Sequence, residues 1–338
     1  MWENRRFYII LILLIIFMVI AIGINLVSGS VNFTFRDLKD ILLKNRELST
    51  LEYNILYKIR IPRIISAILF GGALAISGFL LQTFFRNPIV GPYVLGISSG
   101  ARLFVGIFIL TNLNLKIFNA GALNIFIAAF IGSLLSMVLV LLFAKNVEDI
   151  SSLIVIGIML GYIASAGTNL MITFAEKEKI ASLTIWSMGS FSGITWDMIK
   201  ISTAIIIPTI ILIFTLSKPL EGYLLGENYA KSMGINIKAF RIILIFLSSM
   251  LSACVTAFAG PISFVGVAVP HLTRLTMNTS QPKFLIPGIV LLGSSFCLIS
   301  DYLARTMFSP IELSISTVTS FIGAPIVIAL MLNRRKEI

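Results

Sequence analysis

The side chains that could do chemistry are few and lie far apart. The chain of 338 residues has one histidine, His271, and two cysteines, Cys254 and Cys297. A metal centre built from His and Cys ligands therefore has almost nothing to draw on. The phosphate-binding pattern G-x-x-x-x-G-K-[ST] is absent, because no Gly-Lys dipeptide occurs. We predict no catalytic residue, no metal site and no resident cofactor.

Arginine carries most of the remaining chemistry, because a guanidinium binds a carboxylate or another anion through parallel N–H donors. Arg60 and Arg63 lie in the stretch RIPR, Arg305 lies in SDYLAR, and Arg102 lies within an apolar run. Arginines near the end of a membrane span also snorkel to the interface. An arginine inside a span must pair, reach a water-filled cavity or snorkel. A structural role and a binding role both stay open for these residues.

The stretch Leu224–Asn236, LLGENYAKSMGIN, is a polar, helix-sized interruption of an apolar chain. We expect about two helical turns over 226–233, with Glu227 and Lys231 as an i,i+4 pair and Gly234 ending the helix. So short a helix is marginal alone and must pack an apolar stripe against something. That stripe is Leu225, Tyr229 and Met233. It packs against the chain's own spans or the lipid interface, or in a groove of a partner.

The elements that position these residues are membrane-spanning helices. Hydrophobic residues make up 57% of the chain and charged residues only 12%, which is the composition of an integral membrane protein. The uncharged runs predict an all-α protein with these ten spans: Phe7–Val27, Ile64–Phe85, Tyr93–Thr111, Phe118–Phe143, Ile150–Thr173, Ile199–Ser217, Ile242–Ala259, Ile262–Thr276, Phe284–Ser300 and Leu313–Leu332.

Glycine and proline mark two of these spans. The run GGALAISG, residues 71–78, allows close helix packing, which is its more common use in membranes. The eighth span contains breaks at Gly260-Pro261, Gly266 and Pro270. A broken helix is tolerated at membrane depth only where protein or a cavity shields its backbone. We expect this break to lie near a translocation path.

Charge predicts the orientation and limits the source of energy. Most lysines and arginines fall on one side of the ten spans, which the positive-inside rule assigns to the cytoplasm together with both termini. The net charge of +11 is spread over separate loops, so it gives no support to nucleic-acid binding.

The predicted spans hold no carboxylate, and Asp301 falls just past the ninth. A secondary transporter needs such groups. A channel, which needs no energy source, and a purely structural subunit, which needs no transport path, stay as alternatives. Because the spans lack carboxylates and the chain lacks the phosphate-binding pattern, energy for transport must come from another chain.

Three long motifs resemble the FecCD family of ABC importer permeases, whose members carry iron-siderophore, haem and cobalamin complexes. They are RIPRIISAILFGGALAISGFLLQTFFRNPIVGPYVLGISSGA (60–101), LGENYAKSMGIN (225–236) and AGPISFVGVAVPHLTRL (259–275). The resemblance implies a permease fold of the large-cobalamin and siderophore type, with 1–338 as a single transmembrane permease domain and 218–238 as its cytoplasmic coupling loop. It also implies a homo- or heterodimer with a second permease subunit, two ABC ATPase subunits, a substrate-binding protein and a bacterial cytoplasmic (inner) membrane.

The resemblance also assigns roles to residues. The family's ATPase-coupling segment matches Leu225, Gly226, Glu227, Ala230, Lys231, Met233 and Gly234. The arginines that receive acidic side chains of the binding protein match Arg60, Arg63 and Arg305. The inner gate matches Ser151 and Ser152. Arg102 departs from the family's pattern, in which small residues follow GISSGA, and it either contacts an anionic chelate or makes a structural pair.

The cargo is left open by the residues themselves. With one histidine and no ligand cluster, the chain cannot bind a bare metal ion well, so we expect a bulky preformed complex. A ferric siderophore or related iron chelate is the first expectation from the resemblance. Haem and cobalamin are the alternatives.

Overall fold

The computed structural model describes residues 2–29, 33–34, 37, 41, 49–110, 121–144, 147 and 150–334, and helices are its only regular structure. The all-α prediction is confirmed. A helix corresponds to each of the ten predicted spans: α1 (Trp2–Val27), α4 (Ile61–Phe85), α5 (Ile97–Leu110), α6 (Gly121–Ala144), α7 (Ile150–Thr173), α9 (Trp196–Thr215), α12 (Ile237–Ala259), α13 (Val265–Met277), α14 (Pro282–Thr306) and α15 (Ile315–Arg334). The predicted end at Thr111 and start at Phe118 lie outside the described residues.

Within the described residues, seven of these helices are long and apolar enough to cross a membrane. They are α1, α4 with the turns before it, α6, α7, α9, α12 and α14. Two others, α5 and α15, are apolar but shorter, and α13 has 13 residues. The short helices follow Gly- and Pro-containing segments, where the backbone leaves the helix and must be shielded by neighbours.

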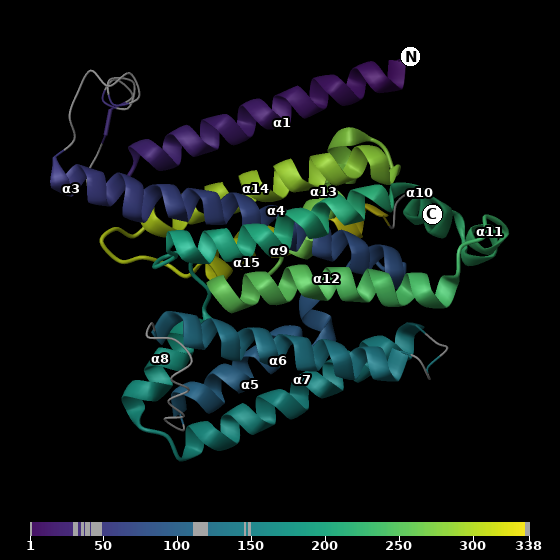
Figure 1. The fold of residues 1–338 in the computed structure, drawn as a ribbon. Coiled ribbons are helices and arrows are strands. Elements are labelled where there is room, and N and C mark those ends of the chain that lie inside the picture. Colours follow the sequence, from purple (N-terminus) through teal and green to yellow (C-terminus); the bar gives the residue numbers. More distant parts are fainter. Residues whose placement is uncertain are drawn as a thin grey trace.

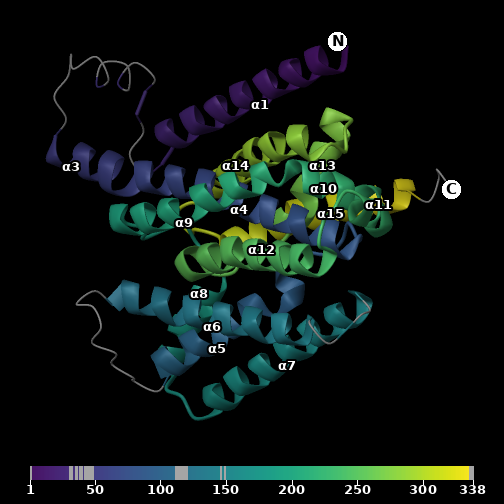
Figure 2. The same ribbon diagram turned by 45° about the vertical axis from the view of Figure 1, so that its right-hand side comes forward.

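Helix α4 lies in the centre of one group of helices, packed against α12, α13 and α14, while α1 lies along the outside of α14 (Figure 1). A second group holds α5, α6, α7 and the short α8 (Lys177–Ser187), and it meets the first group through α6 and α12 (Figure 2). Stacked rings of Phe126 on α6 and Phe258 on α12, with centroids 3.9 Å apart, join the groups.

The glycines of α4 bring it into backbone contact with two helices. A Cβ on Gly78 would lie 1.8 Å from the carbonyl oxygen of Gly266, and one on Gly71 would lie 2.3 Å from that of Gly293. The predicted packing role of the GGALAISG run is thus confirmed. Because lipid tails are as apolar as leucine, close van der Waals contact replaces the hydrophobic effect as the force that joins these helices.

Two boundaries differ from the prediction in ways that change the chemistry. The second span begins earlier than Ile64, because α3 (Thr50–Tyr53) and a π-helical stretch, η1 (Asn54–Arg60), run directly into α4. Arg60 and Arg63 thus lie inside a continuous helix. The ninth helix, α14, continues past Ser300 to Thr306, so the prediction that the spans lack a carboxylate is wrong for Asp301.

The predicted break in the eighth span is confirmed at its start. Residues 260–264 are not helical, and Gly260 and Phe264 have positive φ values of 71° and 63°. Pro270 lies inside α13 without ending it. Helix α8 was not predicted, because its sequence KEKIASLTIWS is only weakly apolar.

The contact between Gly78 and Gly266 can be tested with one methyl group. Gly78→Ala forces two backbones apart, and overpacking of this kind costs about 3 kcal/mol. We expect a lower melting temperature in detergent or nanodiscs. Gly161→Ala is the matched control, because a Cβ there meets its neighbours at ordinary distances of 3.5 Å and more. Equal melting of the two variants would contradict the contact.

Candidate functional site

Most of the residues singled out in the sequence lie at one or the other end of the helices, with Arg102 as the exception. Helices α10 (Ser217–Leu225) and α11 (Glu227–Ser232) lie at one end, near the N-terminus of α1 and the end of α15 (Figure 1). Helix α7 begins at the same end, and its first turn contains Ser151 and Ser152. The connection between α14 and α15, residues 307–314, lies at the other end. We call these the α11 end and the arginine end.

Helix α11 is bounded by two glycines in conformations that other residues rarely adopt. Gly226 caps its start with φ 133°, and Gly234 follows it with φ 81°. The prediction that Gly234 ends this helix is confirmed. The Ala230 carbonyl accepts a hydrogen bond from the Ile235 amide at 3.1 Å, which closes the C-terminal turn. The segment therefore has one defined conformation despite its length.

One side of α11 is buried, and the apolar stripe next to it is half exposed or more. Ala230 is fully buried in the core of the first helix group. Leu225, Tyr229 and Met233 are 67%, 50% and 51% exposed. The stripe therefore packs only in part against the chain itself, with the Met233 sulfur beside Gly222 of α10. The exposed part of the stripe is left for a partner or for the lipid interface.

Glu227 holds α11 against α12. Its Oε1 accepts hydrogen bonds from Arg241 Nη2 at 2.5 Å and from the Tyr223 hydroxyl at 3.1 Å. The predicted pair of Glu227 with Lys231 does not form, because Arg241 of α12 offers a partly buried partner, whereas Lys231 is exposed. Partial burial alone would raise the pKa of Glu227, but the hydrogen bond and charge of Arg241 outweigh burial and hold this pKa below its usual value.

A buried ionic cluster occupies the arginine end. Arg63 Nε donates to both carboxylate oxygens of Asp301 at 2.9 Å, and Arg63 Nη2 contacts Asp301 at 2.8 Å and also pairs with Glu312. Arg305 Nε lies 3.2 Å from the Asp301 carboxylate, and Arg305 Nη2 donates to Asn25 Oδ1 at 2.5 Å. The cluster therefore joins α4 to α14 through Asp301, and it joins α1 to α14 through Asn25.

Arg60 belongs to the same end but has different partners. Its Nη1 donates to the carbonyl of Leu26 at 2.6 Å, and its guanidinium lies 5.0 Å from the ring of Phe33. Arg60 is 4% exposed and Arg63 is 6% exposed. These arginines do not snorkel, because their heads are satisfied within the protein. The cluster lines a cavity of about 520 Å³ that Arg60, Arg63, Arg305 and Glu312 share.

The residues predicted for the translocation path lie apart from that cluster. Arg102 is on α5, and its buried Nε has no hydrogen-bond partner among the described residues. Ser151 and Ser152 open α7. The structure does not bring Arg102 together with the two serines in any of the cavities described here.

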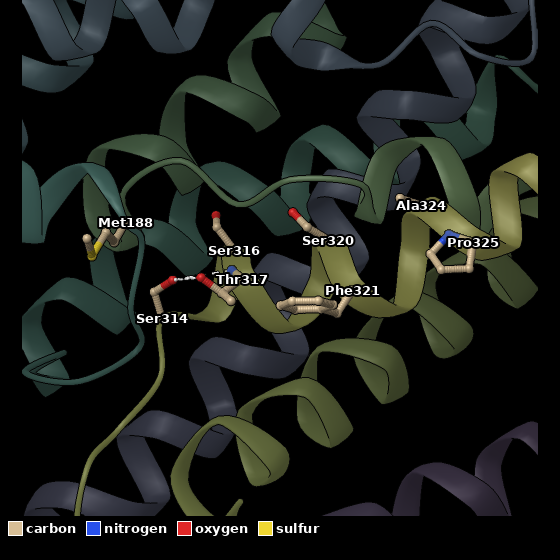
Figure 3. A pocket seen from close by; sticks show the side chains of 8 residues that line it. All are labelled: Met188, Ser314, Ser316, Thr317, Ser320, Phe321, Ala324 and Pro325. Atoms are coloured by element: carbon tan, nitrogen blue, oxygen red, sulfur yellow. Dashed lines mark hydrogen bonds between the residues drawn. The ribbon is translucent and has the colours of Figure 1, made fainter. Parts of the chain in front are cut away.

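Sequence reasoning missed a cavity of about 580 Å³ along α15. Figure 3 shows Ser316 and Ser320 on one side of that helix and Phe321 on another, with Met188 facing them from the segment after α8. Ser316 Oγ donates to the Pro261 carbonyl at 2.5 Å, so the broken segment before α13 lies beside this cavity. The available signal was the run of small polar residues in SISTVTS, which supplies Ser314, Ser316, Thr317 and Ser320 to the lining.

A second cavity, of about 660 Å³, lies beside α10 at the α11 end. Its lining includes Arg86, His271 and Arg274. Arg274 Nη1 donates to Gln82 Oε1 at 3.0 Å, which holds the arginine at the cavity wall. Cys254 and Cys297 are both buried and free.

Comparison with known proteins decides the family. The profile of the FecCD transport family matches residues 12–333. The chain belongs to the FecCD transport family. The hemin transport system permease protein HmuU of Yersinia pestis is 32% identical to this chain, over 96% of this chain and 95% of HmuU. The vitamin B12 import system permease protein BtuC of Escherichia coli (strain HS) is 34% identical over 83% and 84% of the two chains.

Two solved structures share the fold of this FecCD chain. A chain from a metal-chelate type ABC transporter, in an inward-facing conformation, superposes with a TM-score of 0.84 at 29% identity, covering 96% of this chain and 99% of that one. PsaBC from Streptococcus pneumoniae superposes with a TM-score of 0.53 at 15% identity over 80% and 90% of the chains, which concerns the fold alone.

The Glu227–Arg241 pair of this FecCD chain predicts a pH dependence. A carboxylate whose folded pKa lies below its unfolded value of about 4.3 stabilises fully above that value. The stabilisation is lost as the pH falls through the lower, folded pKa. We expect amide protection over 227–234, corrected for intrinsic exchange, to fall below about pH 4.

Two variants serve as the comparison for this measurement. Glu227→Gln should show low protection of 227–234 that does not change across this pH range. Glu221→Gln removes an exposed carboxylate of α10 and should behave as the wild type. A pH profile of Glu227→Gln identical to that of the wild type would contradict the role of the pair.

Proposed function

We propose that this chain is the permease subunit of an ATP-driven importer that passes a ferric siderophore or related iron chelate across the cytoplasmic membrane. Two separate ATPase subunits drive it, a binding protein delivers the cargo, and a second permease chain completes the path. The observation that carries the proposal is the short helix α11, which is tied to the bundle on one side and carries an apolar stripe that is half exposed or more.

The contacts of α11 suit the transmission of force. A partner that covers Leu225, Tyr229 and Met233 gains apolar burial, which the exposed side chains of these residues can supply. Any displacement of α11 acts directly on α12, because Glu227 and Arg241 join the two helices at 2.5 Å. Packed elements move as rigid bodies rather than deforming continuously. Together these features favour a coupling segment that receives its motion from an ATPase.

The other assigned roles follow the same proposal. Arg60, Arg63 and Arg305 form the docking end for the binding protein. Arg102, Ser151 and Ser152 belong to the path and its inner gate. In this proposal the α11 end and both termini face the cytoplasm, and the arginine end faces outward. Proximity of α7's first turn to the α11 end supports an inner position for the two serines.

Asp301 does not favour a secondary transporter, although it lies within α14. Its side chain is 2% exposed, and Arg63 and Arg305 both contact it. A carboxylate that carries protons or sodium must exchange its partner during the cycle. Asp301 is instead committed to two fixed cations, so ATP hydrolysis by a partner chain remains the better-supported source of energy.

The nature of the cargo rests on family members. HmuU is named for hemin, BtuC for vitamin B12, and the superposed transporter for a metal chelate. All three are bulky complexes in which the metal is already held. Among the described residues, no group of three or more His, Cys, Asp or Glu side chains could hold a bare ion. Haem or cobalamin is the alternative to an iron chelate.

Coupling can be tested by straining α11 without crowding it. Gly234 has φ 81° and nothing within 4 Å of a built Cβ, so Gly234→Val distorts only the backbone. We expect the variant to reach the membrane but to lose most transport-coupled ATP hydrolysis in proteoliposomes. Gly193→Val is the control, since Gly193 has φ 77° and equally open surroundings far from α11. Wild-type coupling in Gly234→Val would contradict the assignment.

Uptake assays test the cargo directly. Cells expressing the transporter with its ATPase and binding protein are offered a labelled ferric siderophore, haem or cobalamin in parallel. We expect saturable, ATP-dependent uptake of the ferric siderophore. Preference for haem or cobalamin would select the alternative cargo, and uptake that persists without the ATPase would contradict the proposed mechanism.

A further inference from the structure

The two carboxylates that contact Arg63 differ in how firmly they are held. Asp301 is a buried residue of α14, 2% exposed at its side chain, and it also contacts Arg305. Glu312 belongs to the 307–314 connection, is 38% exposed at its side chain and, among the described residues, pairs with Arg63 alone. Asp301 is therefore a fixed counter-ion of the cluster, whereas Glu312 can be exchanged with little reorganisation of the core.

Glu312 also joins an otherwise loosely attached segment to α4. The connection exposes three large apolar side chains, Met307, Phe308 and Ile311, at 58%, 60% and 69%. Its backbone is linked to α14 by the Leu313 amide, which donates to the Ala304 carbonyl at 2.9 Å. Contact with α4 comes through the Glu312 carboxylate. The connection then leads directly into α15, whose first residues line the 580 Å³ cavity.

The charges around the 520 Å³ cavity at the arginine end favour binding of an acidic side chain from a partner. Arg60, Arg63 and Arg305 contribute three positive charges, and Asp301 and Glu312 contribute two negative ones. A carboxylate that enters the cavity from outside is attracted by the excess of one positive charge. It meets the partly exposed Glu312 before the buried Asp301. Guanidinium pairs with any well-placed carboxylate, so the two acidic groups compete for Arg63.

We propose that Glu312 is an internal substitute for a docking carboxylate. In the undocked chain it holds the 307–314 connection on Arg63. An acidic side chain of the binding protein replaces it there, and the released connection frees the start of α15. The inference rests on the proposed function, because it requires an acidic binding protein at this end. Glu312 thus has two effects. It opposes docking, and its release when docking is complete changes the start of α15 beside the 580 Å³ cavity.

Hydrogen exchange tests the internal contact without any partner. The full-length permease is reconstituted in nanodiscs, and amide exchange over 307–314 is compared between the wild type and Glu312→Gln. We expect exchange to be several times faster in the variant, since the amide group lacks the charge that Arg63 binds. Asp197→Asn is the control, because Asp197 makes an exposed ion pair with Lys200 at the first turn of α9. Equal exchange in the wild type and Glu312→Gln would overturn the inference.

A binding measurement tests the competition. The substrate-binding protein that co-purifies with the transporter is titrated against each nanodisc preparation. Removal of the competitor should tighten binding about fivefold to tenfold in Glu312→Gln and leave Asp197→Asn unchanged. Weaker or unchanged binding by Glu312→Gln would overturn the inference. Failure of the wild type to bind such a protein would instead count against the proposed function, while the exchange measurement still decides whether the internal contact exists.

A second variant covers the case in which Glu312→Gln does not accumulate. Glu312→Asp preserves the charge of the cluster but shortens the side chain by one methylene, which withdraws it from Arg63. The same two changes are expected, in the same direction and smaller. Wild-type exchange and affinity in Glu312→Asp would then overturn the inference.

Discussion

The backbone contacts of α4 are the constraint on which the rest of the structure depends. Gly78 lies against Gly266 of α13, and Gly71 lies against Gly293 of α14, with no room for a Cβ at either point. Helices in a membrane gain little from hiding apolar surface, because lipid is equally apolar. Close approach must then supply the attraction, and only glycine allows it here. Once α13 and α14 are fixed on α4, the arginine end and the broken segment before α13 are fixed as well.

The buried charges follow from that packing. Arg63 and Asp301 face each other because α4 and α14 approach closely, and at that depth neither charge could remain single. Arg305, one turn along α14, shares the same carboxylate. The cluster is complete only when α1 also contributes Asn25. Removing one member would leave an uncompensated charge, which is far more costly than exchanging the whole cluster for apolar residues.

Local patterns in the sequence predicted the elements well and their partners poorly. The ten helices, the close packing of 71–78 and the stop at Gly234 depend on hydropathy and glycine content, which neighbouring residues reveal. The pair of Arg63 and Asp301 joins positions 238 apart in the chain. Glu227 likewise preferred Arg241, 14 residues away, to the adjacent turn of its own helix. Burial of Arg60 and Arg63 arises from such distant contacts and could not be foreseen from spacing.

The two ends of the permease present their groups in opposite ways, and this difference bears on how each would meet a partner. The stripe on α11 is apolar and half exposed or more, so it remains unsatisfied until another protein lies on it. Contacts of that kind favour a partner that stays bound. At the arginine end, Arg63 is already paired with carboxylates of its own chain. A partner's carboxylate must therefore replace one ion pair with another, which gains little binding free energy. Such an interface suits a partner that arrives, is recognised and leaves. The physical asymmetry thus matches a permanent motor at one end and a transient delivery protein at the other.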